Sequence, residues 1–241
     1  MYGLQVRTGS LRNTAALKPS RWTNKLSEIP YGLKQIIIMI AHYLYVQRVQ
    51  MKWIAIEGTD GSGKNTIAER IKELYISKGN SVEIFIHPSE RFAGKCMKSC
   101  LQGNGVKYHL SVFFFILDLL TSLSKIKRCK ADIVIFIRYA MSAAYLPPRL
   151  VKPCYRFLTR LFPTPDELLF VDIDPKTAMN RIHMRNEEWE MFETEESISD
   201  IRKKMISISE GWDIVDNSLD LETTYRQLEK LVDAWNLKKI C

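Results

Sequence analysis

The chain has 241 residues, of which 46% are hydrophobic and 26% are charged. This length fits one full domain with a terminal arm, and the composition excludes a disordered or collagen-like chain. The five cysteines include no C-x-x-C pair, which argues against a zinc ribbon and against a disulfide framework. An odd number of cysteines without such a framework favours a reducing, cytoplasmic compartment.

The net charge of +8 is concentrated at the N-terminus. Residues 1–50 hold seven basic residues and one acidic residue, so they carry six of the eight positive charges. Residues 51–241 are close to neutral, which argues against nucleic acid as a partner. The apolar run at residues 36–46 is shorter than the about 20 residues that a membrane-spanning helix needs, so no membrane partner is expected.

We expect the boundary of the folded domain near residue 50. Residues 1–50 form a basic arm without a steady hydrophobic period, and residues 51–241 contain every predicted strand. Three interpretations of the arm remain open: a short helix packed on the domain, an acid-poor targeting arm, and translated sequence upstream of the true start. The third is favoured because Met51 directly precedes a strongly predicted strand.

Residues 51–241 alternate short β-branched runs with helical periods, which predicts βαβ units around a parallel sheet. The continuous apolar character of the strands indicates burial on both faces. An almost wholly apolar stretch at residues 110–127 predicts a core helix, and five prolines between residues 147 and 165 are expected to break up the connection before the fourth strand. Strands are predicted at residues 53–57, 82–86, 133–137, 168–173 and 212–215.

Gly58, Gly63 and Lys64 satisfy the spacing G-x-x-x-x-G-K between a predicted strand and a predicted helix. Glycines allow the backbone to wrap around an anion, the helix N-terminus adds partial positive charge, and the lysine reaches the transferring phosphates. The motif predicts an α/β fold of the P-loop NTPase type, in which helices flank a five-stranded parallel sheet. The residues expected to bind ATP are Gly58, Thr59, Asp60, Gly61, Ser62, Gly63, Lys64, Asn65 and Thr66.

Asn65 occupies the position after the lysine, where a serine or threonine hydroxyl normally ligates Mg²⁺. An amide oxygen can still coordinate a hard cation or hold one of its waters. Asn65 is therefore a candidate metal ligand, and weaker binding of Mg²⁺ than by a hydroxyl is expected.

The phosphate loop, with Glu57 before it and Asp60 inside it, resembles the E-G-x-D-G-x-G-K-[ST]-T loop of the thymidylate kinase family of nucleoside monophosphate kinases. The resemblance covers residues 51–235. In that family the carboxylate at the position of Asp60 accepts from the 3′-hydroxyl of the acceptor nucleotide. The resemblance therefore implies that Asp60 binds substrate.

A second segment, Ile137-Arg138-Tyr139 followed by Ser142 and Tyr145, resembles the family's D-R-[YFWH]-x-x-S-x-x-A-[YF]. It implies that Arg138 and Tyr139 bind substrate and that Arg138 grips the acceptor phosphate, a task that suits a rigid guanidinium fork. Ile137 replaces the acidic residue of the pattern, which removes another candidate for holding Mg²⁺.

The acceptor's base pocket matches the family only in part. Phe115 fits the first position of F-x-x-x-R, which implies that its ring stacks on the base, and Leu119 stands where the base-reading arginine is expected. If the helix directs position 119 over the base, Leu119 replaces a hydrogen-bonding arginine with an apolar side chain. Ile86-His87-Pro88 stands at the family's R-x-P, so Pro88 matches and Ile86 replaces the arginine. Arg91, three residues after Pro88, is a substitute candidate for binding substrate.

The segment at residues 172–175, followed by Arg181, Arg185 and residues 192–193, resembles a strand, the helix after it and the lid of the family. Arg181 and Arg185 are one helical turn apart and share a face. Lid arginines would neutralise charge on the transferring phosphoryl group. The predicted catalytic residues are Lys64, Arg138, Arg181 and Arg185.

The resemblance implies an enzyme that uses ATP and Mg²⁺ to phosphorylate a deoxynucleoside monophosphate, dTMP to dTDP being the first choice. A nucleoside monophosphate substrate and a second copy of the chain are the expected partners. Two alternatives stay open at this point. Leu119 and Ile86 suggest a kinase for another nucleoside monophosphate, whereas Asn65 and Ile137 suggest a weakly catalytic nucleotide-binding protein that acts through a partner.

Overall fold

The computed structural model describes residues 51–101, 106–126, 128–184, 194–218 and 220–237. The predicted arm at residues 1–50 lies outside these residues, as does Arg185. Within them, five parallel strands form one sheet in the order β2-β3-β1-β4-β5, which confirms the predicted fold class. The strands are β1 (Lys52–Glu57), β2 (Val82–Ile86), β3 (Ile133–Ile137), β4 (Glu167–Asp172) and β5 (Asp213–Asp216).

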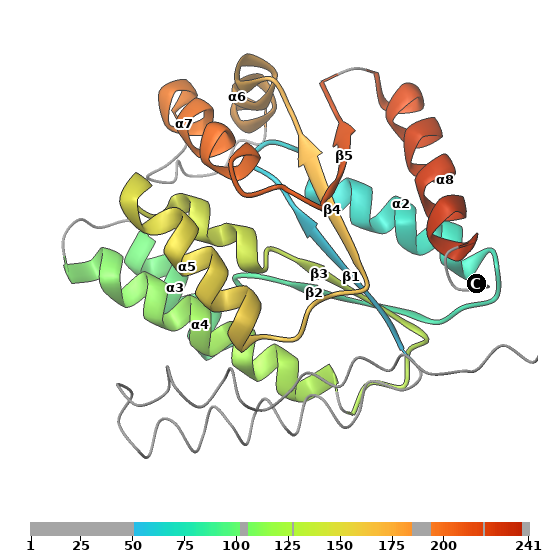
Figure 1. Cartoon of the computed structure of the whole chain (residues 1–241), viewed down its shortest axis with the longest axis horizontal. Helices are drawn as coiled ribbons and strands as arrows, with labels where there is room; N and C mark the ends of the chain where they lie inside the picture. The colour runs from blue at the N-terminus through green and yellow to red at the C-terminus, as the bar shows by residue number, and fades with distance from the viewer. Residues whose placement is uncertain (1–50, 102–105, 127, 185–193, 219, 238–241) are drawn as a thin grey trace, which may run out of the picture. The chain divides into compact units, whose positions relative to one another are not determined.

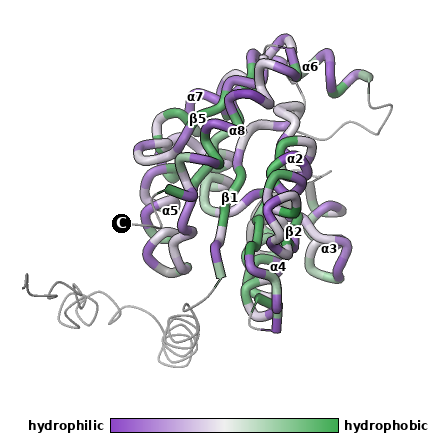
Figure 2. Tube along the Cα trace, turned by 90° about the vertical axis from the view of Figure 1, so that its right-hand side faces the viewer, coloured by the Kyte–Doolittle hydropathy of each residue, from purple (hydrophilic) through white to green (hydrophobic). Residues whose placement is uncertain are grey.

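The central strand β1 is buried on both faces, as its unbroken apolar sequence predicts. Because side chains alternate along a strand, Ile54 and Ile56 pack into one hydrophobic core while Trp53 and Ala55 pack into the other. β3 divides its side chains between the two cores in the same way. Figure 2 shows the hydrophobic colouring that runs along β1.

Helices cover both faces of the sheet (Figure 1). α2 (Lys64–Ile76) and α8 (Leu221–Leu237) close one core. The other core is closed by α4 (Val106–Ile126), the 3-10 helix η2 (Ala140–Tyr145), α5 (Pro148–Leu161) and α7 (Glu195–Ile206). α3 (Phe92–Leu101) packs on α4, and α6 (Pro175–His183) packs on α7. None of the described helices is long and apolar enough to cross a membrane.

The connection before β4 is a helix, so the expectation that prolines break it up is wrong. α5 has 14 residues, and Pro148 occupies its first turn, where a backbone N–H has no helical partner in any case. Pro153 lies inside the helix. Pro153 and Arg149, whose carbonyl would have accepted the missing hydrogen bond, are both exposed, so water can satisfy that carbonyl.

The carboxyl ends of the parallel strands lie at one edge of the sheet, and the loops that leave β1, β3, β4 and β5 therefore meet there. The phosphate loop follows β1, and the segment around Arg138 follows β3. This edge brings together most of the residues that the sequence singled out.

Candidate active site

The phosphate loop occupies residues 58–63, between β1 and α2. Gly61 and Gly63 have φ angles of 75° and 82°, in the left-handed region that favours glycine. A side chain on Gly61 would also place its Cβ 2.6 Å from the carbonyl oxygen of Ala178 in α6. The loop thus needs glycine at position 61 for both its conformation and its packing against α6.

Lys64, the first residue of α2, turns its side chain back into the phosphate loop. Its Nζ atom donates to the carbonyl oxygens of Gly58 at 2.9 Å and Thr59 at 2.5 Å, and lies 4.0 Å from Asp60 Oδ1. The side chain is buried. The ammonium group is therefore held where the backbone of the loop would wrap an anion.

Asn217, directly after β5, holds the phosphate loop from outside. Its Nδ2 donates to the carbonyl of Ser62 at 2.8 Å, and its Oδ1 accepts from the Thr224 hydroxyl at 3.1 Å. Arg181 Nη2 donates to the backbone carbonyl of Asn217 at 2.9 Å, which places this predicted catalytic arginine beside the loop. No motif in the sequence pointed to Asn217; its position after the last strand is the one available signal.

Asp60 and Arg138, predicted from two separate motifs, form an ion pair in which Arg138 Nη2 donates to Asp60 Oδ1. The other carboxylate oxygen of Asp60 accepts from the Tyr145 hydroxyl at 2.9 Å. Burial, followed by the negative charge of Asp60, raises the pKa of Tyr145 well above its usual value, so this hydroxyl stays a donor. The loops after β1 and β3 are thereby joined through their functional side chains.

Arg138 has a φ of 65°, which is uncommon for a residue other than glycine. Its backbone N–H donates to the carbonyl of Ile56 at 3.1 Å. The carboxylate oxygen Oε1 of Glu57 accepts from the N–H groups of Tyr139 at 2.6 Å and Met141 at 2.8 Å. Hydrogen bonds on both sides of Arg138 therefore support its unusual backbone conformation.

The Glu57 side chain is fully buried. Burial raises its pKa to about 7, and the two N–H donors, together with the positive charges of Lys64 and Arg138, partly offset this rise. The sequence marked Glu57 only as part of a motif and assigned it no role.

Tyr139 is a correction to the predicted substrate-binding set. Its ring is 2% exposed, packs edge-on to Trp53 with ring centroids 5.1 Å apart, and donates its hydroxyl to the carbonyl of Pro163 at 2.8 Å. The side chain packs in the hydrophobic core instead. Of these two neighbouring residues, Arg138 is the one whose side chain contacts Asp60 in the site.

The position of Leu119 on α4 differs from the one expected for a residue of the base pocket. Leu119 is 0% exposed and packs in the same hydrophobic core as Phe115, so it does not face a base. Phe115 is 7% exposed, and its ring lies edge-on to that of His87 with centroids 6.5 Å apart. The stacking role of Phe115 remains a prediction. The apolar face of α4 fills the core at both positions.

Arg91 is tied to α4 rather than extended into solvent. Its Nη2 donates to Asp118 Oδ1 at 3.0 Å and to the Ser122 hydroxyl. Asp118 is fully buried, and its Oδ2 also accepts from the backbone N–H of Ser89 at 2.7 Å. Arg91 is thus held on the helix that carries Phe115, by an acidic partner that the sequence reading missed.

His87 lies in the same group of side chains and is neutral at physiological pH. Burial lowers its pKa to about 4. Its Nδ1 lies 3.2 Å from the carbonyl of Ile137 and its Nε2 lies 2.8 Å from the Ser122 hydroxyl. Because a carbonyl can only accept, we assign the ring proton to Nδ1.

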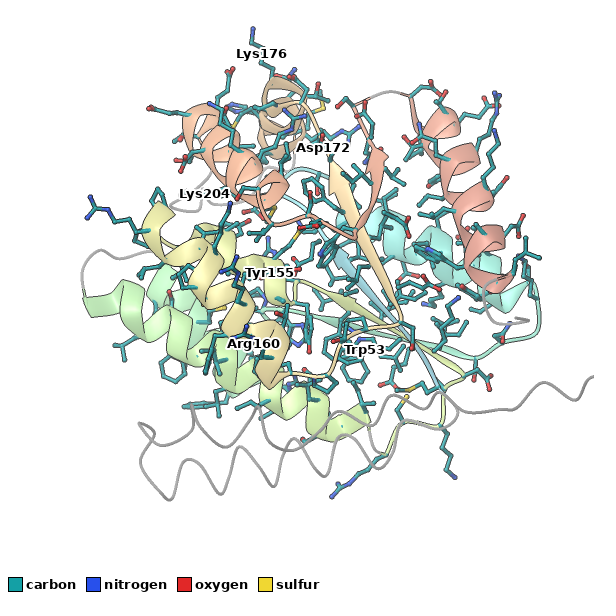
Figure 3. The ribbon with its side chains drawn as sticks, viewed as in Figure 1. Trp53, Tyr155, Arg160, Asp172, Lys176 and Lys204 are labelled. Carbon is teal, nitrogen blue, oxygen red and sulfur yellow. The ribbon has the colours of Figure 1, made fainter. Side chains whose placement is uncertain are left out.

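A bidentate ion pair attaches α7 to the sheet at the same edge. Arg202 donates from Nε and Nη2 to the two carboxylate oxygens of Asp172 at 2.6 and 2.7 Å. Figure 3 shows Asp172 at the end of β4, close to α6 and α7. The backbone carbonyl of Asp172 also accepts from the N–H of Asn217 at 2.9 Å. This contact links α7 to the residue that holds the phosphate loop.

Comparison with known proteins places these features in one family. The sequence profile of the thymidylate kinase family matches residues 56–228. The probable thymidylate kinase of Archaeoglobus fulgidus is 29% identical over 195 residues, which cover 77% of this chain and 97% of the relative. The probable thymidylate kinase 1 of Saccharolobus solfataricus is 31% identical over 188 residues, which cover 75% and 96%.

A solved structure shows the same fold. Thymidylate kinase from Candida albicans superimposes with a TM-score of 0.59 and 19% identity, over 77% of this chain and 92% of that one. The region matched by the family profile begins in β1, contains the phosphate loop and the Arg138 segment, and ends in α8. Since that region is most of the chain, the protein belongs to the thymidylate kinase family of nucleoside monophosphate kinases.

Proposed function

We propose that this enzyme transfers the γ-phosphate of ATP to dTMP and forms dTDP. One observation carries the proposal beyond the family relationship: the guanidinium of Arg138 is paired with Asp60, whose carboxylate lies 4.0 Å from the ammonium of Lys64. A loop built to wrap the phosphates of one nucleotide therefore adjoins a cation able to hold a second phosphate. Transfer between two bound nucleotides requires this proximity.

In this proposal, four basic side chains supply the positive charge for transfer. The transition state is loose, so catalysis depends on positioning and on neutralising charge, and no protein nucleophile takes part. Lys64 binds the transferring phosphates, Arg138 binds the acceptor phosphate, and Arg181 acts from beside the loop at Asn217. We propose the same role for Arg185 as a second lid arginine.

The acceptor nucleotide is bound by Asp60 through its 3′-hydroxyl and by Phe115 through its base. Arg91 completes this set from the loop after β2, where Asp118 fixes its guanidinium. The remaining proposed ATP contacts are the backbone of the loop and the residues that begin α2.

Mg²⁺ is the proposed metal, bound mainly by the phosphates of ATP. Among the described residues, no group of three or more histidine, cysteine or acidic side chains could hold a metal ion. Mg²⁺ bound to nucleotide phosphates needs only one or two protein oxygens, and Asn65, exposed in the first turn of α2 beside Lys64, offers one. The residues present fit such a site. When bound, the metal neutralises charge on the phosphates.

Coupled ADP release across dTMP, dUMP, dCMP and dGMP tests the proposed reaction. We expect turnover to be highest with dTMP. Lys64→Ala should abolish turnover, because no other group in the loop replaces the ammonium, and should leave the thermal unfolding midpoint nearly unchanged. Lys72→Ala is the matched control, since Lys72 lies on the same helix and its side chain forms an exposed ion pair with Glu69.

Two outcomes would overturn the proposal. Equal activity of Lys64→Ala and Lys72→Ala would remove the assignment of the phosphate loop. Turnover of another monophosphate in preference to dTMP would replace the proposed substrate.

A cytoplasmic location and a homodimer also remain proposals. The location is supported by the free thiols of Cys96, Cys100, Cys129 and Cys154.

A further inference from the structure

Glu57 joins the two loops that hold the proposed substrates. It is the last residue of β1 and directly precedes the phosphate loop, yet its side chain reaches across to the turn after β3. There its Oε1 atom accepts from the backbone N–H groups of Tyr139 and Met141. The carboxylate thus fixes the backbone on the carboxyl-terminal side of Arg138.

Arg138 needs such support because its backbone is strained. A φ of 65° is unfavourable for a residue other than glycine, and it persists only where the surroundings impose it. On the amino-terminal side, the N–H of Arg138 bonds the carbonyl of Ile56. On the other side, the two bonds to Glu57 hold the backbone N–H groups of Tyr139 and Met141.

The second carboxylate oxygen of Glu57 is free to take up a proton. Oε2 is buried and has no hydrogen-bond partner among the described residues. Burial raises the pKa of Glu57 to about 7, so both protonation states are populated near neutral pH. The charged and titratable groups that act on this carboxyl are Lys64 of α2, Arg138 and Tyr139 of the turn after β3, Tyr145 of η2 and Tyr155 of α5.

We propose that Glu57 is a positioning residue: its ionised carboxylate holds the turn that carries Arg138 in the conformation that binds the acceptor phosphate, and proton uptake by Glu57 weakens acceptor binding. The proposal rests on the proposed function, in that Arg138 binds that phosphate. A charged acceptor makes hydrogen bonds about twice as strong as a neutral one. Protonation therefore weakens both bonds that support the strained turn.

An opposing effect has to be separated from this one. A carboxylate also repels an incoming phosphate, so repulsion alone would make proton uptake favourable for acceptor binding. The two effects have opposite signs. The direction of the change in KM therefore decides between positioning and repulsion.

Glu57→Gln tests the proposal, because the amide keeps the size of the side chain and can accept both hydrogen bonds without a charge. We expect its KM for dTMP to be roughly ten-fold higher than that of the wild type at pH 8, and the ratio to approach one at pH 6. The KM for ATP should change less than two-fold. Glu83→Gln, on the exposed side of β2, is the matched control and should follow the wild type.

Comparison of the two proteins at each pH removes the contribution of the phosphate of dTMP, which titrates equally for both. A lower KM in Glu57→Gln would show that repulsion dominates, and a ratio independent of pH would show a static structural role; either result overturns the proposal. An equal rise in the KM for ATP would place the effect in the phosphate loop and overturn it too. Absence of turnover in the wild type, by contrast, would overturn the proposed function.

A measurement on the wild type keeps the proposal testable if Glu57→Gln does not fold. At pH 7.5 both protonation states of Glu57 are populated, whereas dTMP is mostly the dianion. Calorimetric titration with dTMP in two buffers of different ionisation enthalpy counts the protons exchanged. Net proton release on binding supports the proposal, and net uptake or no exchange contradicts it.

Discussion

At the scale of single residues, Asp60, Arg138 and Tyr145 form a short chain of polar side chains between the loops after β1 and β3. Each carboxylate oxygen of Asp60 has its own donor, one from the guanidinium and one from the phenol. A buried carboxylate is favourable only when it is paired and its remaining oxygen is hydrogen-bonded, and the Tyr145 hydroxyl supplies that second donor to Asp60. The orientation of Arg138 therefore depends on Tyr145 as well as on Asp60.

Leu119 leads to a prediction about stability rather than specificity. Leu119→Arg should lower the free energy of unfolding by about 3–5 kcal/mol, because a guanidinium in a closed apolar core loses its hydration without gaining a partner. It should not improve the KM for dTMP. Urea unfolding of this variant and of Leu117→Arg provides the measurement, since Leu117 lies on the same helix but is exposed.

The control variant is expected to change stability by no more than about 0.5 kcal/mol. A stable Leu119→Arg protein with a lower KM for dTMP would instead restore Leu119 to the base pocket, and would show that α4 can turn this side chain toward the substrate.

At the scale of elements, α5 shows how tertiary packing overrides a local signal. Its buried face, which includes Val151 and Leu158, packs in the hydrophobic core with α4 and η2. Figure 3 shows Tyr155 on the same helix, where its hydroxyl accepts from Trp212 Nε1 at 2.9 Å. These contacts keep the helix continuous past Pro153, although a proline inside a helix removes one backbone hydrogen bond.

Pro153→Ala should therefore stabilise the protein by about 1–3 kcal/mol. The alanine restores the hydrogen bond to the exposed carbonyl of Arg149 and has a far higher helix propensity than proline. Pro148→Ala is the control: at the first turn of the same helix, proline is well tolerated, so its removal should bring no gain. Urea unfolding of the two variants measures the difference. Equal changes in the free energy of unfolding for the two variants would mean that Pro153 does not destabilise α5.

At the scale of the whole molecule, the sheet separates two hydrophobic cores, and the site lies at one edge of the sheet rather than in either core. Two buried titratable groups beside that edge respond to pH in opposite directions. Glu57 has a folded-state pKa raised to about 7, and His87 has one lowered to about 4, in both cases because burial disfavours the charged form. Their effects on stability should largely cancel in the wild type.

The sign follows from the protons that each state binds. Between about pH 4.5 and 7 only the folded state keeps the proton on Glu57, so this group lowers stability as the pH rises. Between about pH 4 and 6.5 only the unfolded state keeps the second proton on His87, so this group raises stability with pH. Each contributes about 1.4 kcal/mol per pH unit, with opposite sign.

Glu57→Gln should therefore gain stability relative to the wild type by about 1.4 kcal/mol per pH unit between pH 4.5 and 7, because the substitution removes the contribution of Glu57 and leaves that of His87 in place. Urea unfolding of both proteins over this range measures the difference, and Glu83→Gln should run parallel to the wild type. Parallel curves for Glu57→Gln and the wild type would show that Glu57 does not titrate in this window.

The fold class, the five strands, the phosphate loop and the family could all be predicted from the amino-acid sequence. These features depend on local patterns: continuous apolar runs for buried strands, glycines at fixed spacing for the loop, and short motifs for Asp60 and Arg138. Each pattern lies within a short stretch of neighbouring residues, so it can be recognised without knowing which distant residues are in contact. The bounds of all five strands differ from the predicted ones by one residue or less.

Which side chains reach the site could not be predicted in this way, because it depends on how distant elements pack. Leu119 and Tyr139 stand in motif positions, but their directions depend on how α4 and the turn after β3 pack against the sheet, and both point into the core. Asn217 and Arg202 contact the loop and β4 from elements far along the chain. The proposed role of Glu57 also depends on a contact between distant parts of the chain, because a hydrogen bond between residues 82 positions apart leaves no pattern in the sequence.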